Sequence, residues 1–255
     1  KDQALKDKVL NTTQNDEIDG NILFKDMSIP VKIRLKGVFT DHLIGDKWSF
    51  RVKTKNNKTL LGMREFSLQH PRTRHYINEF IFHKLLEYEE LPYLRYKFLT
   101  LKLNGRNLGT YAIEEHFSNE LIENSGFREG PIIRFNKEVY VSELSRDQKL
   151  NSKYPHIPAR FDYWGRISNL DVFNKRKIYT NKNFSIQAET GIKLLNDFLL
   201  GKKKASEVFD IEKTAIYFAI NDILGSYHSY FWTNIRFYYN PITARLIPIG
   251  FDSTN

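Results

Sequence analysis

Apolar and polar residues alternate with a period of two in several short stretches of the first half of the chain. Residues 31–36 and 48–53 follow this pattern, and 66–68 is a shorter run of the same kind. This period is typical of half-buried strands. The Asn104-Gly105 pair, flanked by apolar runs within 98–113, predicts a two-stranded hairpin. We therefore expect strands that pair with their neighbours in sequence.

A long helix is predicted between these strands. From Thr73 to Glu90 the apolar residues take helical spacing, and Pro92 ends the pattern. The predicted apolar face consists of Tyr76, Ile77, Phe80, Ile81, Leu85 and Tyr88, interrupted by Lys84. A shorter helix is predicted after a Ser118 cap, followed by a strand over 132–135.

The second half of the chain is predicted to be richer in helix. Residues 137–185 show no sustained period and are interpreted as loops with short helices. A helix is predicted over 186–200, ending at Gly201, and another from an Asp210 cap to Gly225. The apolar face of the last helix is predicted to consist of Ala215, Phe218, Ala219 and Ile223.

These elements predict an α+β fold of two lobes. Strands over 235–239 and 245–249 form a C-terminal hairpin in this interpretation. We expect a frayed N-terminal segment over 1–26, a sheet-rich lobe with one main helix over 27–136, and a helix-rich lobe over 137–255. Because the chain stops soon after its last motif, we expect it to be truncated at the C-terminus.

Composition narrows the classes of function. The 255 residues are 41% hydrophobic and 27% charged and contain no cysteine, which excludes disulfides, zinc–thiolate sites, iron–sulfur clusters and thiol nucleophiles. The formal net charge of +9 favours anionic partners. The dense basic runs 175–177 and 202–204 are interpreted as solvated turns, so nucleic-acid binding is the weaker alternative.

The sequence leaves localisation open. No signal peptide is present at the first residue, and no apolar run approaches the ~20 residues of a transmembrane helix. The chain does not begin with Met, so we expect a fragment or a processed chain. The absence of cysteine suits the cytoplasm, the cell surface and the periplasm equally, and an extracytoplasmic or cell-surface bacterial location is one of these expectations.

Candidate chemistry gathers near the C-terminus, at Asp222, His228, Asn234 and Asp252. Walker, dinucleotide-binding, zinc-helix and nucleophile-elbow motifs do not occur. Asn234 begins one arm of the predicted hairpin and Asp252 ends the other, so the two side chains are expected to lie side by side. An amide oxygen beside a carboxylate suits magnesium or manganese that carries phosphates. The structural alternatives are a turn-forming aspartate and a structural histidine.

A family resemblance strengthens this interpretation. The order of a base-like residue, an asparagine, a hairpin and an aspartate is also that of protein kinases. In addition, ordered blocks of the chain resemble those of the CotH family, named for a bacterial spore-coat protein and regarded as atypical kinases. The blocks are Ile33-Arg34-Leu35-Lys36-Gly37, Lys47-Trp48-Ser49-Phe50, Leu61 to Leu68, Leu103 to Glu115, and Asn234 to Asp252.

The resemblance implies a kinase-like fold that binds ATP and a divalent cation between the sheet lobe and the C-terminal hairpin. It implies phosphoryl transfer to a Ser or Thr hydroxyl of a protein substrate. Arg34 and Lys47 would face the nucleotide phosphates, and Asn234 and Asp252 would bind Mg²⁺ or Mn²⁺. Glu115 would act as a ligand, an ion-pair partner or a cap.

The resemblance leaves alternatives open for three further residues. Glu79 would pair with a lysine, as the helix glutamate of kinases does, or lie on the solvent side. His228 stands where the family usually has a catalytic aspartate; a neutral imidazole accepts a proton but lacks the negative charge that orients a hydroxyl. Asp222, six residues earlier, would be a substitute base only if the helix ends there. The alternative is therefore a catalytically impaired, pseudokinase-type scaffold in cell-envelope or coat assembly.

Overall fold

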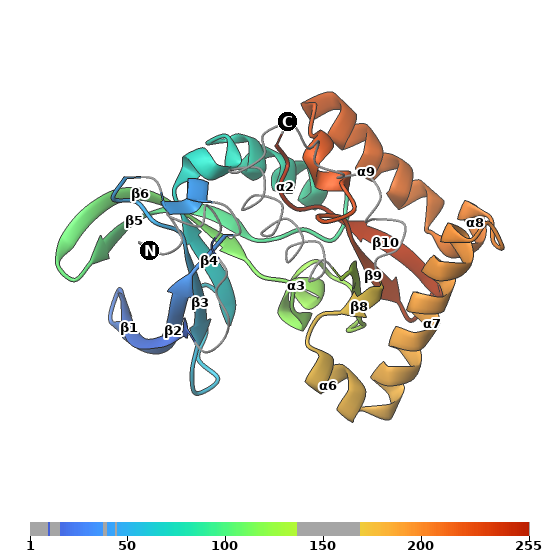
Figure 1. Cartoon of the computed structure of the whole chain (residues 1–255), viewed down its shortest axis with the longest axis horizontal. Helices are drawn as coiled ribbons and strands as arrows, with labels where there is room; N and C mark the ends of the chain where they lie inside the picture. The colour runs from blue at the N-terminus through green and yellow to red at the C-terminus, as the bar shows by residue number, and fades with distance from the viewer. Residues whose placement is uncertain (1–9, 11–15, 38–39, 44, 137–168, 255) are drawn as a thin grey trace, which may run out of the picture. The chain divides into compact units, whose positions relative to one another are not determined.

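Two antiparallel sheets and several helices give the described chain a mixed α+β fold (Figure 1). The computed structural model describes residues 10, 16–37, 40–43, 45–136 and 169–254. The chain divides into two compact units. The sheet unit contains the described residues up to Thr73 and Tyr96–His116, and the helical unit contains Arg74–Arg95, Phe117–Asn136 and the described residues from 169 onward.

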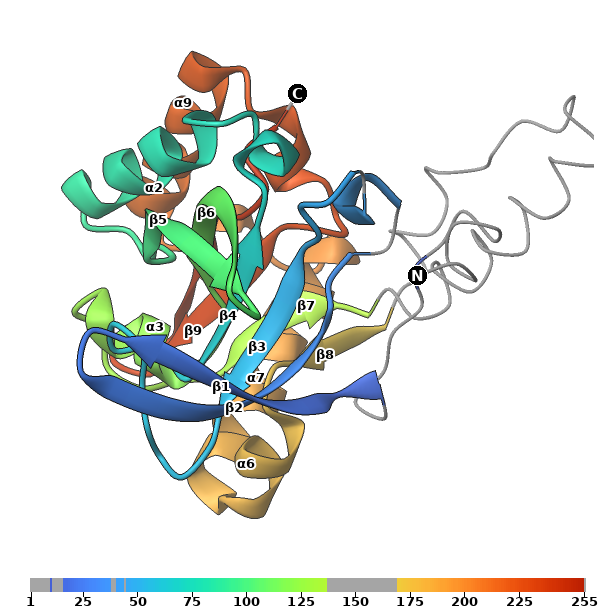
Figure 2. The ribbon, with the colours of Figure 1, turned by 90° about the vertical axis from the view of Figure 1, so that its left-hand side faces the viewer.

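The sheet unit is built on a curled six-stranded antiparallel sheet with the strand order β1-β2-β3-β4-β6-β5 (Figure 2). Its strands are β1 (Ile18–Phe24), β2 (Met27–Leu35), β3 (Phe50–Thr54), β4 (Glu65–Gln69), β5 (Tyr96–Leu103) and β6 (Arg106–Glu115), with a 3-10 turn η2 (Thr40–Leu43). Val31, Val52, Phe66 and Tyr111 are fully buried on one face and form its core. The predicted hairpin at Asn104-Gly105 is confirmed, and both residues adopt positive φ, 49° and 81°.

Residues 18–24 form a strand, so the expected frayed segment over 1–26 is wrong for this part of the chain. Residues 1–9 and 11–15 lie outside the described residues. β1 pairs with β2 along its whole length, through a turn at Lys25-Asp26 in which Lys25 has a φ of 53°. The turn lacks Gly or Asn, and Ile18 and Leu23 are exposed, so neither turn chemistry nor alternation indicated this strand.

The helical unit contains a four-stranded antiparallel sheet with the strand order β10-β9-β7-β8. Its strands are β7 (Ile132–Phe135), β8 (Leu170–Val172), β9 (Arg236–Asn240) and β10 (Arg245–Ile249). Its helices are α2 (Asn78–Tyr88), α3 (Asn119–Asn124), α6 (Lys175–Thr180), α7 (Lys182–Leu199), α8 (Ala205–Val208) and α9 (Ile211–Leu224), with the 3-10 turn η4 (Tyr227–Tyr230). The 3-10 turn η3 (Pro71–Arg74) precedes α2. The predicted C-terminal hairpin is confirmed.

The predicted lobe boundary at residue 136 does not follow the compact units. α2 belongs to the helical unit, where Phe82 and Leu86 are fully buried in the same apolar cluster as Tyr217 of α9. The Phe82 and Tyr217 rings meet edge to face with centroids 6.5 Å apart. β7 pairs with β9, far away in sequence. These long-range contacts are not visible in local periodicity.

The buried face of α2 differs from the predicted one. The helix begins at Asn78 rather than near Thr73, because His75 and Tyr76 have left-handed φ values of 47° and 59°. Its buried residues are Glu79, Phe82, His83 and Leu86. Tyr76, Ile77, Ile81 and Tyr88 of the predicted apolar face are exposed. A glutamate and a histidine therefore occupy the buried face in place of apolar side chains.

The ends of α7 and α9 follow their caps. The Asn181 side chain accepts hydrogen bonds from the N–H groups of Asn183 and Phe184, so α7 begins at Lys182 and not at 186. Asp210 caps α9 by accepting from Lys213 N at 3.2 Å, as predicted. The buried residues of α9 are Tyr217, Ile220 and Asn221, whereas Phe218 and Ile223 of the predicted face are exposed. No helix in the described residues is long and apolar enough to cross a membrane.

Gly250 sets the approach of α2 to the end of β10. A Cβ at this position would overlap the Phe82 ring and lie 3.1 Å from Leu86 Cδ1. Both side chains are fully buried and have no room to move away. We expect Gly250→Ala to lower the free energy of unfolding by about 1–3 kcal/mol, measured by urea denaturation. In the double variant with Phe82→Leu the two costs should be less than additive; a Gly250→Ala chain as stable as wild type would contradict this packing.

Candidate functional site

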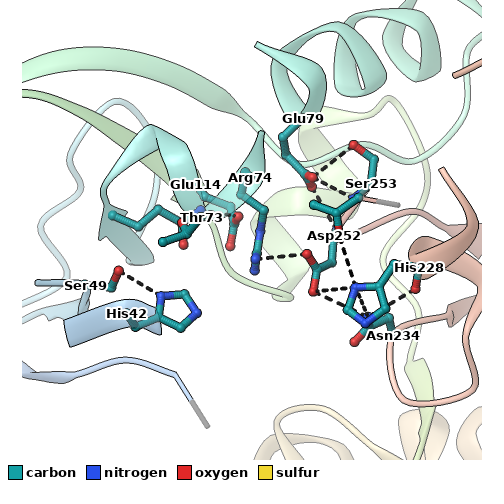
Figure 3. Close-up of polar contacts among 12 residues, drawn as sticks. His42, Ser49, Thr73, Arg74, Glu79, Glu114, His228, Asn234, Asp252 and Ser253 are labelled. Carbon is teal, nitrogen blue, oxygen red and sulfur yellow. Dashed lines mark hydrogen bonds and ion pairs between the residues drawn. The ribbon is translucent and has the colours of Figure 1, made fainter. Parts of the chain in front are cut away.

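The β9–β10 hairpin brings Asn234 and Asp252 together (Figure 3). Arg236 pairs with Ile249 in the register of the hairpin, Asn234 lies two residues before this pair, and Asp252 lies three residues after it. Asn234 Nδ2 donates to Asp252 Oδ2 at 3.4 Å. The predicted proximity of the two side chains is confirmed, and their role in binding a cation stays a prediction.

His228 lies against the same carboxylate. Its Nδ1 atom is 3.3 Å from Asp252 Oδ2 and 3.2 Å from Thr254 Oγ1, and its backbone N–H donates to Thr254 O. Asn234 Nδ2 also donates to His228 O at 3.1 Å. The His228 side chain is 47% exposed, so a ligand in solvent can reach the imidazole. The structure therefore groups His228, Asn234 and Asp252, as the sequence predicts.

Arg74 completes the surroundings of the Asp252 carboxylate, and sequence reasoning missed it. Arg74 Nη1 lies 2.9 Å from Asp252 Oδ1, and the two side chains are only 7% and 13% exposed. The guanidinium also lies over the Phe251 ring, 5.0 Å from its centroid. One carboxylate oxygen thus faces a cation, while the other faces His228 and Asn234.

Glu79 fixes the backbone that carries Asp252. Its fully buried carboxylate accepts hydrogen bonds from Asp252 N at 2.9 Å, Ser253 N at 2.7 Å and Ser253 Oγ at 3.0 Å (Figure 3). His83 Nε2 lies 3.2 Å from Glu79 Oε1. Because His83 Nδ1 accepts a hydrogen bond from Leu94 N, Nε2 carries the hydrogen and donates to Glu79. Glu79 is not on the solvent side, and among the described residues it pairs with no lysine.

The backbone at Asp252 is strained. Asp252 has a φ of 65°, in the left-handed region that few side-chain-bearing residues adopt. Such a conformation costs on the order of 1–3 kcal/mol and persists where the surrounding contacts hold it. The hydrogen bonds from the Asp252 and Ser253 amides to Glu79 provide that hold. Glu79 of α2 therefore fixes the backbone of Asp252, and Arg74 fixes the position of its carboxylate.

The structure does not bring Asp222 to this group. Asp222 is exposed on the last turn of α9. Its neighbour Asn221 turns inward instead, donating to Tyr217 O at 2.7 Å and accepting from the Ser229 hydroxyl. Asn221 thus ties α9 to η4, the turn that carries His228. Asp222 as a substitute base has no support from this geometry.

A second polar cluster lies in the sheet unit and was also missed. Lys36 Nζ donates to Gln69 Oε1 at 2.6 Å and lies 2.8 Å from Glu114 Oε1, and Gln69 Nε2 donates to Glu114 Oε2 at 2.7 Å. All three side chains are buried. The buried Lys36 cation is thus paired with the buried Glu114 carboxylate, and buried charges usually have such a partner.

The predicted nucleotide-binding residues of the sheet unit lie on different strands or loops. Arg34 is half-buried on β2, opposite Arg51, and Glu115 is buried at the end of β6. Lys47 is half-buried, and its Nζ lies 3.4 Å from the position that a Cβ on Gly109 would take. Burial lowers the pKa of His70, and the Lys47 charge contributes to that shift. Their role towards phosphates stays a prediction.

The donor set around Asp252 suits a hard cation only in part. Within the described residues, no three His, Asp or Glu side chains are grouped so that they could hold a metal ion. Asp252 offers a carboxylate, and Asn234 offers an amide oxygen once its amide group is rotated by half a turn. Oxygen ligands of these two kinds fit Mg²⁺ or Mn²⁺, with further positions left for phosphate oxygens or water. Arg74 would have to share Asp252 with the cation.

The chain is therefore a mixed α+β protein with a cluster of polar side chains around Asp252, whose backbone is strained. No protein-family model matches the chain. Comparison with curated proteins gives no significant match.

Proposed function

We propose that the chain is a CotH-like atypical kinase, with a kinase-like two-lobed fold, that binds ATP with Mg²⁺ or Mn²⁺ and phosphorylates a hydroxyl of a protein substrate. The observation that carries the proposal is the convergence of Asn234, Asp252 and His228 at one end of the β9–β10 hairpin. An amide and a carboxylate give two protein ligands for the cation. The remaining positions suit the oxygens of a triphosphate.

The positive charge beside Asp252 fits the same chemistry. Arg74 neutralises the carboxylate through an ion pair of 2.9 Å and is held in place by stacking on Phe251. Phosphoryl transfer needs cations near the oxygens of the transferred group, where negative charge is spread in the transition state. In this proposal Arg74 supplies one such cation, and Glu79 keeps Asp252 in its left-handed conformation.

His228 would serve as proton acceptor. The acceptor oxygen forms a bond to the terminal phosphorus as its proton passes to the imidazole, and the bond from that phosphorus to the bridging oxygen breaks, releasing ADP. The Asp252 carboxylate, 3.3 Å from His228 Nδ1, orients the ring and stabilises the imidazolium formed. The side chain is exposed enough for a protein hydroxyl to approach.

A second candidate function is a pseudokinase-type scaffold for cell-envelope or coat assembly. It is favoured by the ion pair between Arg74 and Asp252, which occupies the carboxylate that a cation would need. It is also favoured by a histidine in place of the catalytic aspartate of the family. In this role the chain would bind nucleotide weakly or without transfer and act through its surface.

We expect the chain, incubated with γ-labelled ATP and Mn²⁺, to label itself or a Ser-rich protein. His228→Ala should slow the transfer by about 100-fold, because a general base contributes 10²–10⁴-fold, and should leave the nucleotide affinity within about twofold. His116→Ala is the matched control, since His116 lies in the sheet unit beside Glu65.

The outcomes separate the two functions. Transfer that depends on His228 supports the kinase, and Mn²⁺-dependent ATP binding without transfer supports the scaffold. If the chain binds no ATP at millimolar concentration in the presence of Mn²⁺, both are overturned.

A further inference from the structure

A cluster of cations crosses one end of the four-stranded sheet. Arg236 of β9 lies opposite Arg134 of β7, which lies opposite Asp171 of β8. Lys175, in the first turn of α6, lies 3.0 Å from Asp171 Oδ2. We refer to Arg134, Lys175 and Arg236, with Asp171, as the arginine cluster. It lies within the helical unit and shares no residue with the proposed kinase site.

Arg236 is a buried cation that forms no ion pair with a described residue. It is 4% exposed, and Nη1 donates to its own neighbour's carbonyl, Ile235 O, at 2.8 Å. Its guanidinium lies over the Phe117 and Phe173 rings, 5.4 and 5.7 Å from their centroids. Its Nε atom is buried and, within the part of the chain that the structure describes, has no hydrogen-bond partner.

Arg134 is only partly neutralised. Its Nη2 lies 3.2 Å from Asp171 Oδ2, and its guanidinium lies over the Phe173 ring at 4.6 Å. Lys175 competes for the same carboxylate oxygen. The Arg134 and Lys175 side chains are 29% and 53% exposed, so the cluster is open to solvent on this side. Arg134 and Lys175 therefore share the Asp171 carboxylate, and Arg236 adds a third positive charge without an ion pair to a described residue.

This arrangement is unfavourable without a further anion. Burial lowers the pKa of the Arg236 guanidinium from its usual range to about 9, and the nearby Arg134 charge adds to this shift. Tyr217 and Asp252 oppose the shift, and Asp252 is the smallest of its causes. An uncompensated buried charge is destabilising, and replacing buried charged groups by apolar residues is often neutral or stabilising. A bound anion would remove this cost.

We infer that the arginine cluster binds a doubly charged oxyanion of the phosphate monoester class. Three cations and one carboxylate leave an excess of two positive charges, which matches a dianion. The Phe117 and Phe173 rings contact the faces of the guanidinium groups of Arg134 and Arg236, so N–H groups at the edges stay available for oxygen atoms of the ligand. The inference does not rest on kinase activity. The ligand is either free phosphate or a phosphorylated side chain, and both have the same chemistry.

The test is thermal unfolding of the full chain with inorganic phosphate or O-phosphoserine, at constant ionic strength and with chloride as the reference salt. At ten times the dissociation constant we expect the melting temperature to rise by roughly 3–6 °C. A response to inorganic phosphate alone indicates a free ion, and an equal or larger response to O-phosphoserine indicates a phosphorylated side chain. No response to either overturns the inference.

Variants separate this site from others. Arg236→Met should abolish the response and, without phosphate, should raise the melting temperature by roughly 3 °C or more, because the isolated buried charge is removed. Arg245→Met, on the neighbouring β10, should keep the response, and so should Asp252→Asn. A response retained in Arg236→Met overturns the inference.

The exposed Lys175 gives a second variant in case Arg236→Met does not fold. Lys175→Gln removes one of the three cations at a side chain that is 53% exposed, so the fold should be preserved. We expect its phosphate affinity to fall by about tenfold. An unchanged affinity in this variant counts against the cluster as the binding site.

Discussion

Asp252→Asn is expected to abolish Mn²⁺-dependent ATP binding. The change keeps the size of the side chain but removes the charged oxygen ligand, and loss of even an outer-shell partner typically costs 10–100-fold in metal affinity. We therefore expect a loss of more than about 100-fold, measured by isothermal titration calorimetry with ATP in the presence and absence of Mn²⁺. Asp222→Asn is the matched control, because Asp222 is exposed on α9 and should leave the affinity unchanged.

Loss of the Arg74 ion pair must be separated from loss of the ligand. Asp252→Asn leaves the Arg74 guanidinium buried beside a neutral amide, which lowers stability. The unfolding transition should be recorded for the same sample, so that binding is measured on folded chain. Mn²⁺-dependent ATP binding of wild-type strength in folded Asp252→Asn protein would remove Asp252 from the site.

Glu79→Gln is expected to lower the free energy of unfolding by about 3 kcal/mol. Each carboxylate oxygen accepts two hydrogen bonds, Oε1 from Asp252 N and His83 Nε2 and Oε2 from Ser253 N and Oγ. An amide turned either way sets its NH₂ group against a backbone N–H donor, that of Asp252 or that of Ser253, and hydrogen bonds to charged groups are worth about 1.5–3 kcal/mol each. Chemical denaturation measures the change.

The same variant should also weaken the candidate site. With an amide at position 79, either Asp252 N or Ser253 N loses its acceptor, so the left-handed backbone at Asp252 is held less firmly and the affinity for Mn²⁺-ATP should fall together with stability. Glu87→Gln on the same helix is the control, since Glu87 is partly exposed and pairs with Lys84 at the surface. Equal stability of Glu79→Gln and Glu87→Gln would show that the buried carboxylate is not the anchor.

Short-range signals predicted several strands and helix ends. The predicted Ser118 cap is wrong in one respect: Ser118 precedes α3, but its side chain makes no capping hydrogen bond. The Asn104-Gly105 turn, the Asp210 cap and the left-handed Gly225 are each determined by residues within a few positions. The buried faces of α2 and α9 were predicted wrongly, because Glu79 and Asn221 are buried to make specific hydrogen bonds. A hydrophobic pattern cannot indicate a buried polar residue whose partner is distant in the sequence.

The candidate site was predicted only where chain geometry is local. Asn234 and Asp252 are placed by one hairpin, which the sequence indicates. Arg74 stands 178 positions before Asp252 in an irregular turn, and Glu79 lies 173 and 174 positions before the amides that it holds. The Lys36 cluster could have been predicted from Gln69 and Glu114. These two polar residues stand near the ends of strands whose neighbouring residues are mostly apolar.

The central claim is that Asn234 and Asp252 bind a divalent cation that carries ATP. A crystal structure of the chain with Mn²⁺ and a non-hydrolysable ATP analogue, recorded with anomalous diffraction, tests it most directly. The account predicts an anomalous peak at about 2.0–2.2 Å from an Asp252 carboxylate oxygen and the Asn234 amide oxygen, with phosphate oxygens completing the coordination. Analogue bound elsewhere, or an Arg74–Asp252 ion pair unchanged with no Mn²⁺ beside it, would contradict the account.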